Sequence, residues 1–335
     1  MPTQDEFLEH YNTNLVVIDK EMTKRYGMRY TEYRRYYAQA GRFEYEPEFP
    51  LYLMFEQTYH CNLYCPSCIH GLSEHKKRFD TNNAIMPREI FDRCIVEAEK
   101  YHCPSLAFMV NDEPLLLKDL YERVSFAKAH GFMDLFITTN GNLLDADAIE
   151  RIIEAGITRI LFSIDAATDK TYEKVRPGGN FSVVLNNLQA LLNYKKNNGL
   201  SLPAVRVSFV ASKLNIHEKD LFIKTFAHQV DYLEIQPFSS YYNINKNLVP
   251  QNATCIKDFR CSEPWRKLII RPNGDVLPCC TFYGYEIILG NCLQMPLKDI
   301  FCGTQCRQLR SEFKEGVYHL SPCIACSGSF YSVKE

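Results

Sequence analysis

The sequence predicts an α/β protein built on a parallel sheet, with a small cysteine-rich segment at its C-terminal end. From residue 51 onward, short apolar runs alternate with amphipathic helical segments, which is the pattern of βα units. The chain has 335 residues, of which 46% are hydrophobic and 13% aromatic, so it can bury a large core. Its 14 cysteines extend from the first βα unit to the last residues of the chain.

Six strands are expected, each a short run rich in β-branched or aromatic residues. They span residues 51–57, 105–110, 134–139, 158–164, 204–211 and 231–236. Helical patterns lie between them, at residues 87–100, 116–130, 145–155, 181–197 and 215–229. Six βα units suit either an open doubly wound sheet or a partial barrel, and in both architectures ligands bind at the carboxyl ends of the strands.

The segment before the first strand is polar and rich in tyrosine, with helical spacing over residues 7–22 and 30–40. We therefore expect three parts: a helical N-terminal extension at residues 1–49, the βα units at residues 50–240, and a cysteine-rich domain at residues 241–335.

Charge and hydropathy indicate a cytoplasmic protein. The formal net charge of −2 gives no overall attraction to nucleic acid or to an anionic membrane. No run approaches the roughly 18 apolar residues of a membrane span, and the first residues do not have the shape of a signal peptide. In such a chain, cysteines are expected to be reduced thiols and metal ligands.

Chemically distinctive residues follow the ends of four successive predicted strands, which indicates one shared site. A loop of three cysteines follows the first strand, and Ser163 closes the fourth. After the second and third strands come Asn111-Asp112-Glu113-Pro114 and Thr139-Asn140-Gly141.

The loop after the first strand holds Cys61, Cys65 and Cys68, spaced x3 and then x2. Thiolates select iron–sulfur clusters, zinc or copper(I), and a cubane cluster usually has four cysteine ligands, so three would leave one iron free. A zinc knuckle is the alternative, with His60 or His70 as a fourth ligand. The spacing resembles the motif of the radical S-adenosylmethionine (radical SAM) superfamily, in which the free iron of a 4Fe–4S cluster chelates SAM.

The resemblance covers roughly residues 50–240 and implies a partial (βα)6 TIM-like barrel. Asn111, Asp112 and Glu113 occupy the place of the family's Gly-Glu-Pro motif, which meets the SAM amino group; a simple turn is the alternative. Ser163 and Arg176 resemble the pair that binds the ribose and carboxylate of SAM, and arginine suits a carboxylate because its donors are paired. The strand-end position of Asn140 adds it to the expected cofactor-binding residues. One position departs from the family, because Ser67 stands where an aromatic residue is usual.

A second cysteine pattern lies in the C-terminal segment. Cys261-x12-Gly274-x4-Cys279 is followed by Cys323-x2-Cys326, and Asn273-Gly274 predicts a hairpin turn between two apolar runs. The pattern resembles the auxiliary-cluster domain of the SPASM/twitch group of radical SAM proteins. Four ligands imply one closed 4Fe–4S cluster, and the shorter twitch form is expected because no cysteine follows Cys326. Zinc is again the alternative, since four thiolates make a good tetrahedral site.

The remaining cysteines are expected to be packing residues, with one possible exception. Cys280, beside a predicted ligand, is the best candidate for a thiol that returns a hydrogen atom to a substrate radical, as in radical SAM epimerases. The aromatic pair Tyr241-Tyr242 and the basic run at residues 75–78 are candidates for the substrate side of the site, although loop packing and a solvated surface explain them equally well.

The resemblance implies the following activity. An external one-electron reductant, such as flavodoxin or ferredoxin, reduces the first cluster, and cleavage of SAM yields a deoxyadenosyl radical that removes hydrogen from the substrate. Electron transfer to the auxiliary cluster then gives dehydrogenation, whereas hydrogen return from a cysteine gives epimerisation. The expected substrate is a carbohydrate or nucleotide sugar. The alternatives are a maturase that modifies a ribosomal peptide or protein and a non-enzymatic, zinc-stabilised binding protein.

Overall fold

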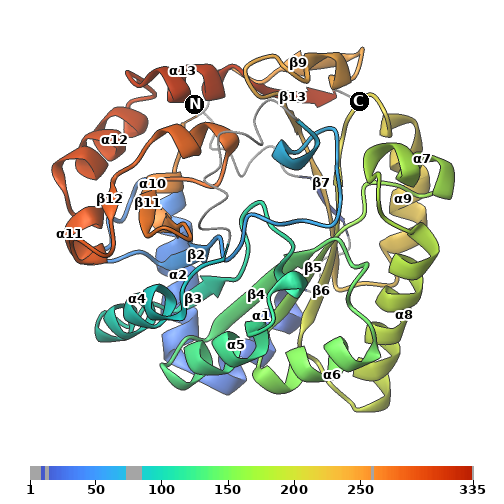
Figure 1. Ribbon diagram of the computed structural model, residues 1–335, viewed down its shortest axis with the longest axis horizontal. Helices are drawn as coiled ribbons and strands as arrows, with labels where there is room; N and C mark the ends of the chain where they lie inside the picture. The colour runs from blue at the N-terminus through green and yellow to red at the C-terminus, as the bar shows by residue number, and fades with distance from the viewer. Residues whose placement is uncertain (1–8, 12–14, 73–84, 258–259, 334–335) are drawn as a thin grey trace.

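The computed structural model describes residues 9–11, 15–72, 85–257 and 260–333 (Figure 1). Within these ranges, ten strands form one sheet in the order β1-β7-β6-β5-β4-β3-β2-β10-β11-β12. The six expected strands are confirmed as neighbouring parallel strands at its centre. They are β2 (Tyr52–Phe55), β3 (Ser105–Ala107), β4 (Asp134–Thr139), β5 (Arg159–Ser163), β6 (Ala204–Val210) and β7 (Tyr232–Gln236).

The five helices expected between the strands are also confirmed, and they cover the outer face of the sheet (Figure 1). They are α4 (Arg88–Lys100), α5 (Leu120–Ala129), α6 (Ala146–Ala155), α8 (Phe181–Asn197) and α9 (Lys219–Phe226), and the short helix α7 (Asp169–Val175) precedes α8. Local signals set their ends. In α6, the Asp145 side chain accepts a hydrogen bond from the Ala148 amide, and Gly156 ends the helix in the left-handed region, at φ 108°.

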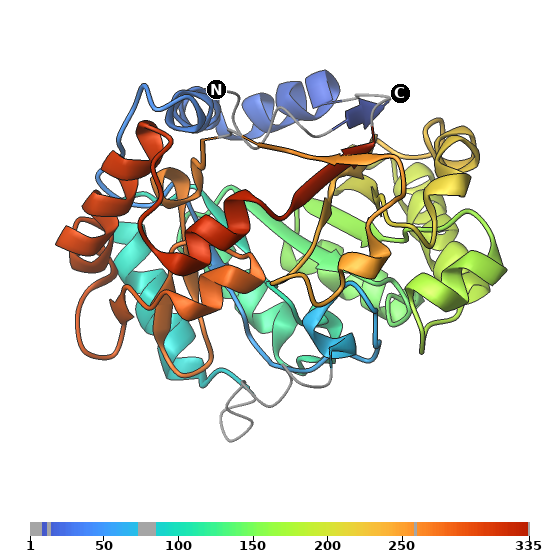
Figure 2. The same cartoon turned by 90° about the horizontal axis from the view of Figure 1, so that it is seen from above.

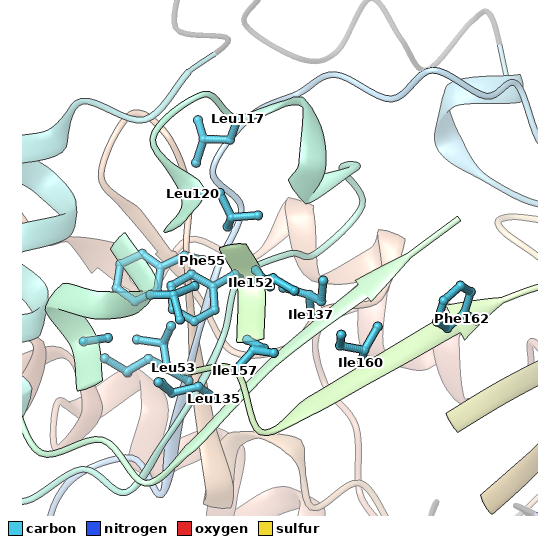
Figure 3. Close-up of a cluster of buried hydrophobic side chains, with 14 of the residues drawn as sticks. Leu53, Phe55, Leu117, Leu120, Leu135, Ile137, Ile152, Ile157, Ile160 and Phe162 are labelled. Carbon is cyan, nitrogen blue, oxygen red and sulfur yellow. The ribbon is translucent and has the colours of Figure 1, made fainter. Parts of the chain in front are cut away.

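Alternate side chains of the parallel strands point outward and form the main core. Figure 3 shows Leu53 and Phe55 of β2, Ile137 of β4 and Ile160 of β5 among the side chains of this cluster, all fully or almost fully buried. The residues between them, such as Tyr52 and Met54, point to the inner face and belong to a separate cluster. The inner and outer faces of the sheet are therefore distinct environments.

The N-terminal segment closes the end of the barrel at which the strands begin. Helices α1 (Leu15–Tyr26) and α2 (Met28–Gly41) lie along one side of the molecule (Figure 2). Tyr30 and Tyr33 of α2 pack with Met133 and Ala204, which lie at strand starts. The helix expected over residues 7–22 is wrong at its beginning, because β1 (Glu9–Tyr11) pairs antiparallel with the edge strand β7.

The C-terminal segment extends the same sheet at its other edge. Strand β10 (Lys267–Ile270) pairs in parallel with β2, and the expected hairpin turn leads to β11 (Asp275–Leu277), with Gly274 at φ 85°. Beyond it are β12 (Gly290–Asn291), α10 (Glu263–Arg266), α11 (Leu297–Phe301), α12 (Thr304–Lys314), α13 (Ser321–Ser327), and a small sheet of β8 (Phe238–Ser239), β13 (Phe330–Val333) and β9 (Ala253–Cys255). Among the described helices, none has the length and apolar character needed to cross a membrane.

Candidate active site

One pocket lies at the carboxyl ends of the central strands. Nine of the predicted residues line it together: Cys61, Cys65, Cys68, Asn111, Asp112, Glu113, Asn140, Ser163 and Arg176. They come from loops far apart in the sequence, and they meet because parallel strands end at the same edge of a sheet. The pocket also contains residues that the sequence did not single out, among them His70, Met109 and Thr138. Met109 and Thr138 could have been found from the alternation along their strands.

The cysteine loop folds back on itself. The amide of Cys68 donates to the carbonyl of Cys65 at 2.9 Å, and the amide of Gly71 donates to the carbonyl of Cys68 at 3.0 Å. A side chain at Gly71 would collide with the carbonyl group of Cys65. Glycine is therefore needed to close this turn.

The surroundings of the three thiols suit a bound metal cluster. The Arg176 guanidinium donates to Cys65 Sγ at 3.6 Å, and Asn140 Nδ2 lies 4.0 Å from Cys61 Sγ. Burial raises the pKa of Cys61 to about 11 and that of Cys68 to about 12. Thiols in such a site stay protonated unless a metal binds, because coordination is what removes the proton. Nearby N–H donors then stabilise the thiolate sulfurs.

Arg176 already has a carboxylate partner. Its guanidinium forms an ion pair with Asp165, whose other oxygen accepts the Val210 amide at 2.8 Å. Burial lowers the pKa of Arg176, but Asp165 and Cys65 outweigh it and leave this pKa above its ordinary value. Asp165 itself has φ 61°, a left-handed conformation that costs a non-glycine residue free energy. A contact between Arg176 and the carboxylate of SAM stays a prediction.

Glu113 joins the ends of two strands. Its carboxylate accepts hydrogen bonds from Thr139 Oγ1 at 2.7 Å, the Asn140 amide at 2.8 Å and the Leu115 amide at 3.3 Å. Burial raises its pKa to about 7, although these three donors favour the charged form. Glu113 therefore fixes the loop that carries Asn140 and still presents a face to the pocket.

Asp112 supports the start of the cysteine loop. Its carboxylate accepts the amides of Val110 at 2.8 Å, Gln57 at 3.2 Å and Thr58 at 3.3 Å. Burial raises its pKa to about 7. These three backbone donors give Asp112 a structural role beside the pocket, and its predicted contact with SAM stays a prediction.

Asn111 links the pocket to the C-terminal segment. Its side-chain amide donates to the Tyr285 hydroxyl at 2.8 Å, and its carbonyl lies 2.7 Å from His70 Nε2. Tyr285 in turn donates to Glu56, at the end of β2. Neither Tyr285 nor Glu56 is marked by a motif, so sequence reasoning did not find this connection.

The four C-terminal cysteines meet in a second cavity. Cys261, Cys279, Cys323 and Cys326 line it together with aromatic side chains such as Tyr283 and Tyr318. Burial raises the pKa of Cys279 to about 11 and that of Cys323 to about 12, so these thiols also need a metal to ionise. A Cβ atom at Gly284 would lie 2.6 Å from Cys279 Sγ, so glycine keeps the space beside the ligand open.

Both cavities fit a group larger than one ion. In the described ranges, no three His, Cys, Asp or Glu side chains lie close enough to share a single metal ion. The seven predicted ligands instead surround two cavities, three thiols at one and four at the other.

Cys280 faces away from the second cavity. Its thiol accepts from Lys267 Nζ at 3.4 Å, and it packs beside a cluster on the inner face of the sheet that includes Tyr52 and Met54. Its proposed role as a hydrogen donor stays a prediction. Tyr241 and Tyr242 both donate to the Glu286 carboxylate, each at 3.0 Å, so their hydroxyls are engaged within the loop layer. The basic run at residues 75–78 lies outside the described residues.

Two family models match the chain. The model of the radical SAM superfamily matches residues 55–206, and the model of the SPASM iron–sulfur cluster-binding domain matches residues 261–327. The second match favours an iron–sulfur cluster over zinc at the four C-terminal cysteines.

Curated relatives match mainly the barrel. The chain is 30% identical over 200 residues to a probable GTP 3',8-cyclase of Methanocaldococcus jannaschii, covering 56% of this chain and 61% of that protein. It is 28% identical over 184 residues to the mycofactocin maturase MftC of Mycobacterium ulcerans, covering 54% and 45%. The chain thus spans about three fifths of the length of the cyclases that it matches.

Solved structures share the fold over most of the chain. BtrN in complex with AdoMet and 2-DOIA has a TM-score of 0.57 at 19% identity, and the match covers 81% of this chain and 89% of BtrN. Streptococcus suis SuiB bound to precursor peptide SuiA has a TM-score of 0.59 at 18% identity, covering 89% and 74%. At this level of identity, these likenesses show the architecture.

Proposed function

Because the chain belongs to the radical SAM superfamily and carries a C-terminal SPASM domain, we propose that it removes a hydrogen atom from a carbohydrate or nucleotide sugar, for dehydrogenation or epimerisation. Its cofactors are SAM and 4Fe–4S clusters, one that binds SAM and auxiliary ones. In this proposal Cys61, Cys65 and Cys68 hold the first cluster, and Cys261, Cys279, Cys323 and Cys326 hold the auxiliary one.

The single observation that carries the proposal is the convergence of three thiols, an arginine and a buried glutamate in one pocket. A reduced cluster in this pocket supplies the electron that cleaves SAM to methionine and a deoxyadenosyl radical. The chain's part is to hold and orient the reactants. Glu113 and Asn140 are fixed by mutual hydrogen bonds, and the Arg176–Asp165 ion pair places a cation beside Cys65.

The carbohydrate class is supported by the likeness to BtrN, because the two chains cover each other almost completely and BtrN was solved with the small molecule 2-DOIA. The inward position of Cys280 supports epimerisation, in which its thiol would return a hydrogen atom to the substrate. Dehydrogenation would instead send an electron to the auxiliary cluster. Flavodoxin or ferredoxin would serve as the external reductant.

Maturation of a ribosomal peptide is the second candidate. It is favoured by the relative MftC, a maturase, and by the likeness to SuiB, which was solved with its precursor peptide SuiA. The two candidates differ in what must enter the barrel, a small polyol or an extended chain.

Anaerobic reconstitution followed by reduction tests the proposal. We expect about eight iron atoms per chain, as two cubanes require, and formation of 5'-deoxyadenosine from SAM. Deuterium transfer from a ring-deuterated sugar into deoxyadenosine would identify the substrate class, whereas transfer from a deuterated peptide would favour the second candidate. Bound zinc without deoxyadenosine would refute radical SAM chemistry in this chain.

A further inference from the structure

Three polar side chains lie together on the inner face of β6 and β7. Arg206 Nη1 donates to both carboxylate oxygens of Glu234, at 3.0 and 3.1 Å, and Gln236 Nε2 donates to the same carboxylate. No sequence motif marks this group. We call Arg206, Glu234 and Gln236 the polar wall.

Strand alternation places the polar wall inside the barrel. Val205, Val207 and Phe209 of β6, and Leu233 and Ile235 of β7, are packed into the outer core. The residues between them therefore point to the inner face.

The strand register sets the height of the polar wall relative to the pocket of the first three cysteines. Ser163 of β5 pairs with Ser208 of β6, and Ser208 pairs with Glu234 of β7. Because neighbouring strands are about 4.8 Å apart, Glu234 lies roughly 10 Å along the sheet from Ser163, a residue that lines the pocket. Barrel curvature shortens that separation through space. A small molecule beside the pocket can therefore reach the polar wall.

Solvent reaches this inner face. The Arg206 side chain is 15% exposed in the middle of a central strand, although its outward neighbours Val205 and Val207 are fully buried. Gln236 is also partly exposed. A buried ion pair made only for stability would be sealed by packing, because unsatisfied charges in a core are costly. An ion pair that faces an open interior is available to a ligand.

The chemistry of the wall favours an uncharged polar ligand. Arg206 and Glu234 neutralise each other, so the wall offers no net charge to a phosphate or carboxylate. Planar guanidinium, carboxylate and amide groups together supply donors and acceptors that match hydroxyl groups. Across the interior, Phe136 and Met109 are partly buried beside an apolar cluster. The interior thus has one polar side and one apolar side, as a sugar ring does.

We propose that Arg206, Glu234 and Gln236 bind the hydroxyl groups of a neutral, polyhydroxylated ring, a sugar or cyclitol, while its C–H face packs toward Phe136. This inference rests on the proposed function, because it assumes that the substrate enters the barrel beside the SAM pocket. It adds the residues that select the substrate and the class they select.

The test uses the reconstituted, full-length protein with ring-deuterated D-glucose, myo-inositol and UDP-glucose as probes. The first two represent free rings, and the third represents a ring attached to a nucleotide. Deuterium in 5'-deoxyadenosine reports which probe reaches the radical. For a probe that transfers deuterium, we expect Gln236→Leu to raise KM about 10-fold and Glu234→Gln to raise it by about 10- to 100-fold, through lost hydrogen bonds. The kcat of Gln236→Leu should change less than its KM.

Asp231→Asn is the matched control. Asp231 precedes β7, and it pairs with Lys195 of α8 at 2.8 Å on the outer side of the sheet. It should leave KM at the wild-type value. Gln236→Leu also guards against misfolding, because it leaves the Arg206–Glu234 ion pair intact.

The outcomes separate the two proposals. If the wild-type protein does not cleave SAM, the proposed function fails. If it cleaves SAM but takes deuterium from none of the three probes, or if Gln236→Leu and Glu234→Gln keep the wild-type KM, the polar wall is not the substrate site and the radical SAM assignment stands.

Discussion

The two cysteine sites differ in how the chain builds them and in what surrounds them. The first takes its three cysteines from one loop of eight residues, in a pocket with Arg176, Glu113 and Asn140. The second takes four cysteines from segments up to 65 residues apart (326 − 261), in a cavity lined largely by apolar and aromatic side chains. A polar pocket with three ligands suits a cluster that must bind SAM, whereas a closed set of four suits a cluster that exchanges only electrons.

The largest expected effect separates the sites by function. Cys65→Ala should abolish SAM cleavage, a fall of more than about 10³-fold, because it removes a ligand of the SAM-binding cluster. Cys323→Ala should retain deoxyadenosine formation but lose the completed product. Each variant should hold about four iron atoms per chain, where the wild-type protein holds about eight. Iron analysis and product chromatography measure both effects.

Cys103→Ala is the control for these variants. Cys103 is buried at 3% exposure, and its thiol lies 3.2 Å from the carbonyl of Pro50, away from both cavities. It should keep the full iron content. Equal loss of SAM cleavage in Cys65→Ala and Cys323→Ala would mean that the two sites do not divide the work as proposed.

A glycine next to the second site gives the next largest effect. In Gly284→Ala, the new methyl group would lie 2.6 Å from Cys279 Sγ and 2.5 Å from the Cys279 carbonyl oxygen, so the backbone must shift. Overpacking of this kind costs about 1–3 kcal/mol, and here the cost falls on a cluster ligand. We expect iron content to fall toward about four atoms per chain while SAM cleavage persists.

Gly328→Ala tests whether this effect depends on position. Gly328 also lies in the C-terminal domain, but a Cβ atom there would be 4.0 Å from its nearest neighbour. It should retain the wild-type iron content. Full iron content in Gly284→Ala as well would show that the cavity has spare room and that the close packing around Cys279 is unimportant.

Two buried arginine–aspartate pairs offer a third comparison. Arg176 pairs with Asp165 beside the first site, and Arg159 pairs with Asp134 at the start of β5, at 2.6 Å. Arg176→Lys should weaken SAM binding by about 10- to 100-fold, because lysine cannot serve both Asp165 and Cys65 with paired donors. Arg159→Lys should lower the unfolding temperature and leave SAM affinity unchanged. Equilibrium dialysis with labelled SAM measures the difference, and equal affinities for the two variants would remove Arg176 from the site.

The sequence was sufficient for features that depend on local pattern. The central strands follow from short apolar runs and the cysteine ligands from their spacing, so these elements and the convergence of their loops were predicted. Pairing between distant segments was not predictable in this way. Strand β10 pairs with β2 across more than 200 residues, and β1 forms because β7 leaves an open edge.

Side-chain direction explains the remaining differences. Arg176 was predicted to face a carboxylate, but its partner Asp165 depends on a left-handed backbone that no motif announces. Cys279 and Cys280 are adjacent, yet one faces the second cavity and the other packs beside the inner cluster. The polar wall becomes recognisable only when the helices show which face of β6 and β7 is outside.

Glu56, which connects the two sites through Tyr285, should give the smallest effect. Burial, with help from nearby Asp112, raises its pKa to about 8 from a model value of 4.5. Between these two pH values the folded protein holds a proton that the unfolded chain releases, so stability should fall as pH rises from about 4.5 to about 8 and level off above. Glu56→Gln keeps the neutral shape and removes this titration. Its unfolding temperature should therefore match the wild-type value near pH 5 and exceed it near pH 8. Glu44→Gln, at an exposed position, is the control and should follow the wild-type curve throughout. Parallel curves for Glu56→Gln and wild type would show that Glu56 is ionised in the folded protein, and the link between the two sites would then contain a charge.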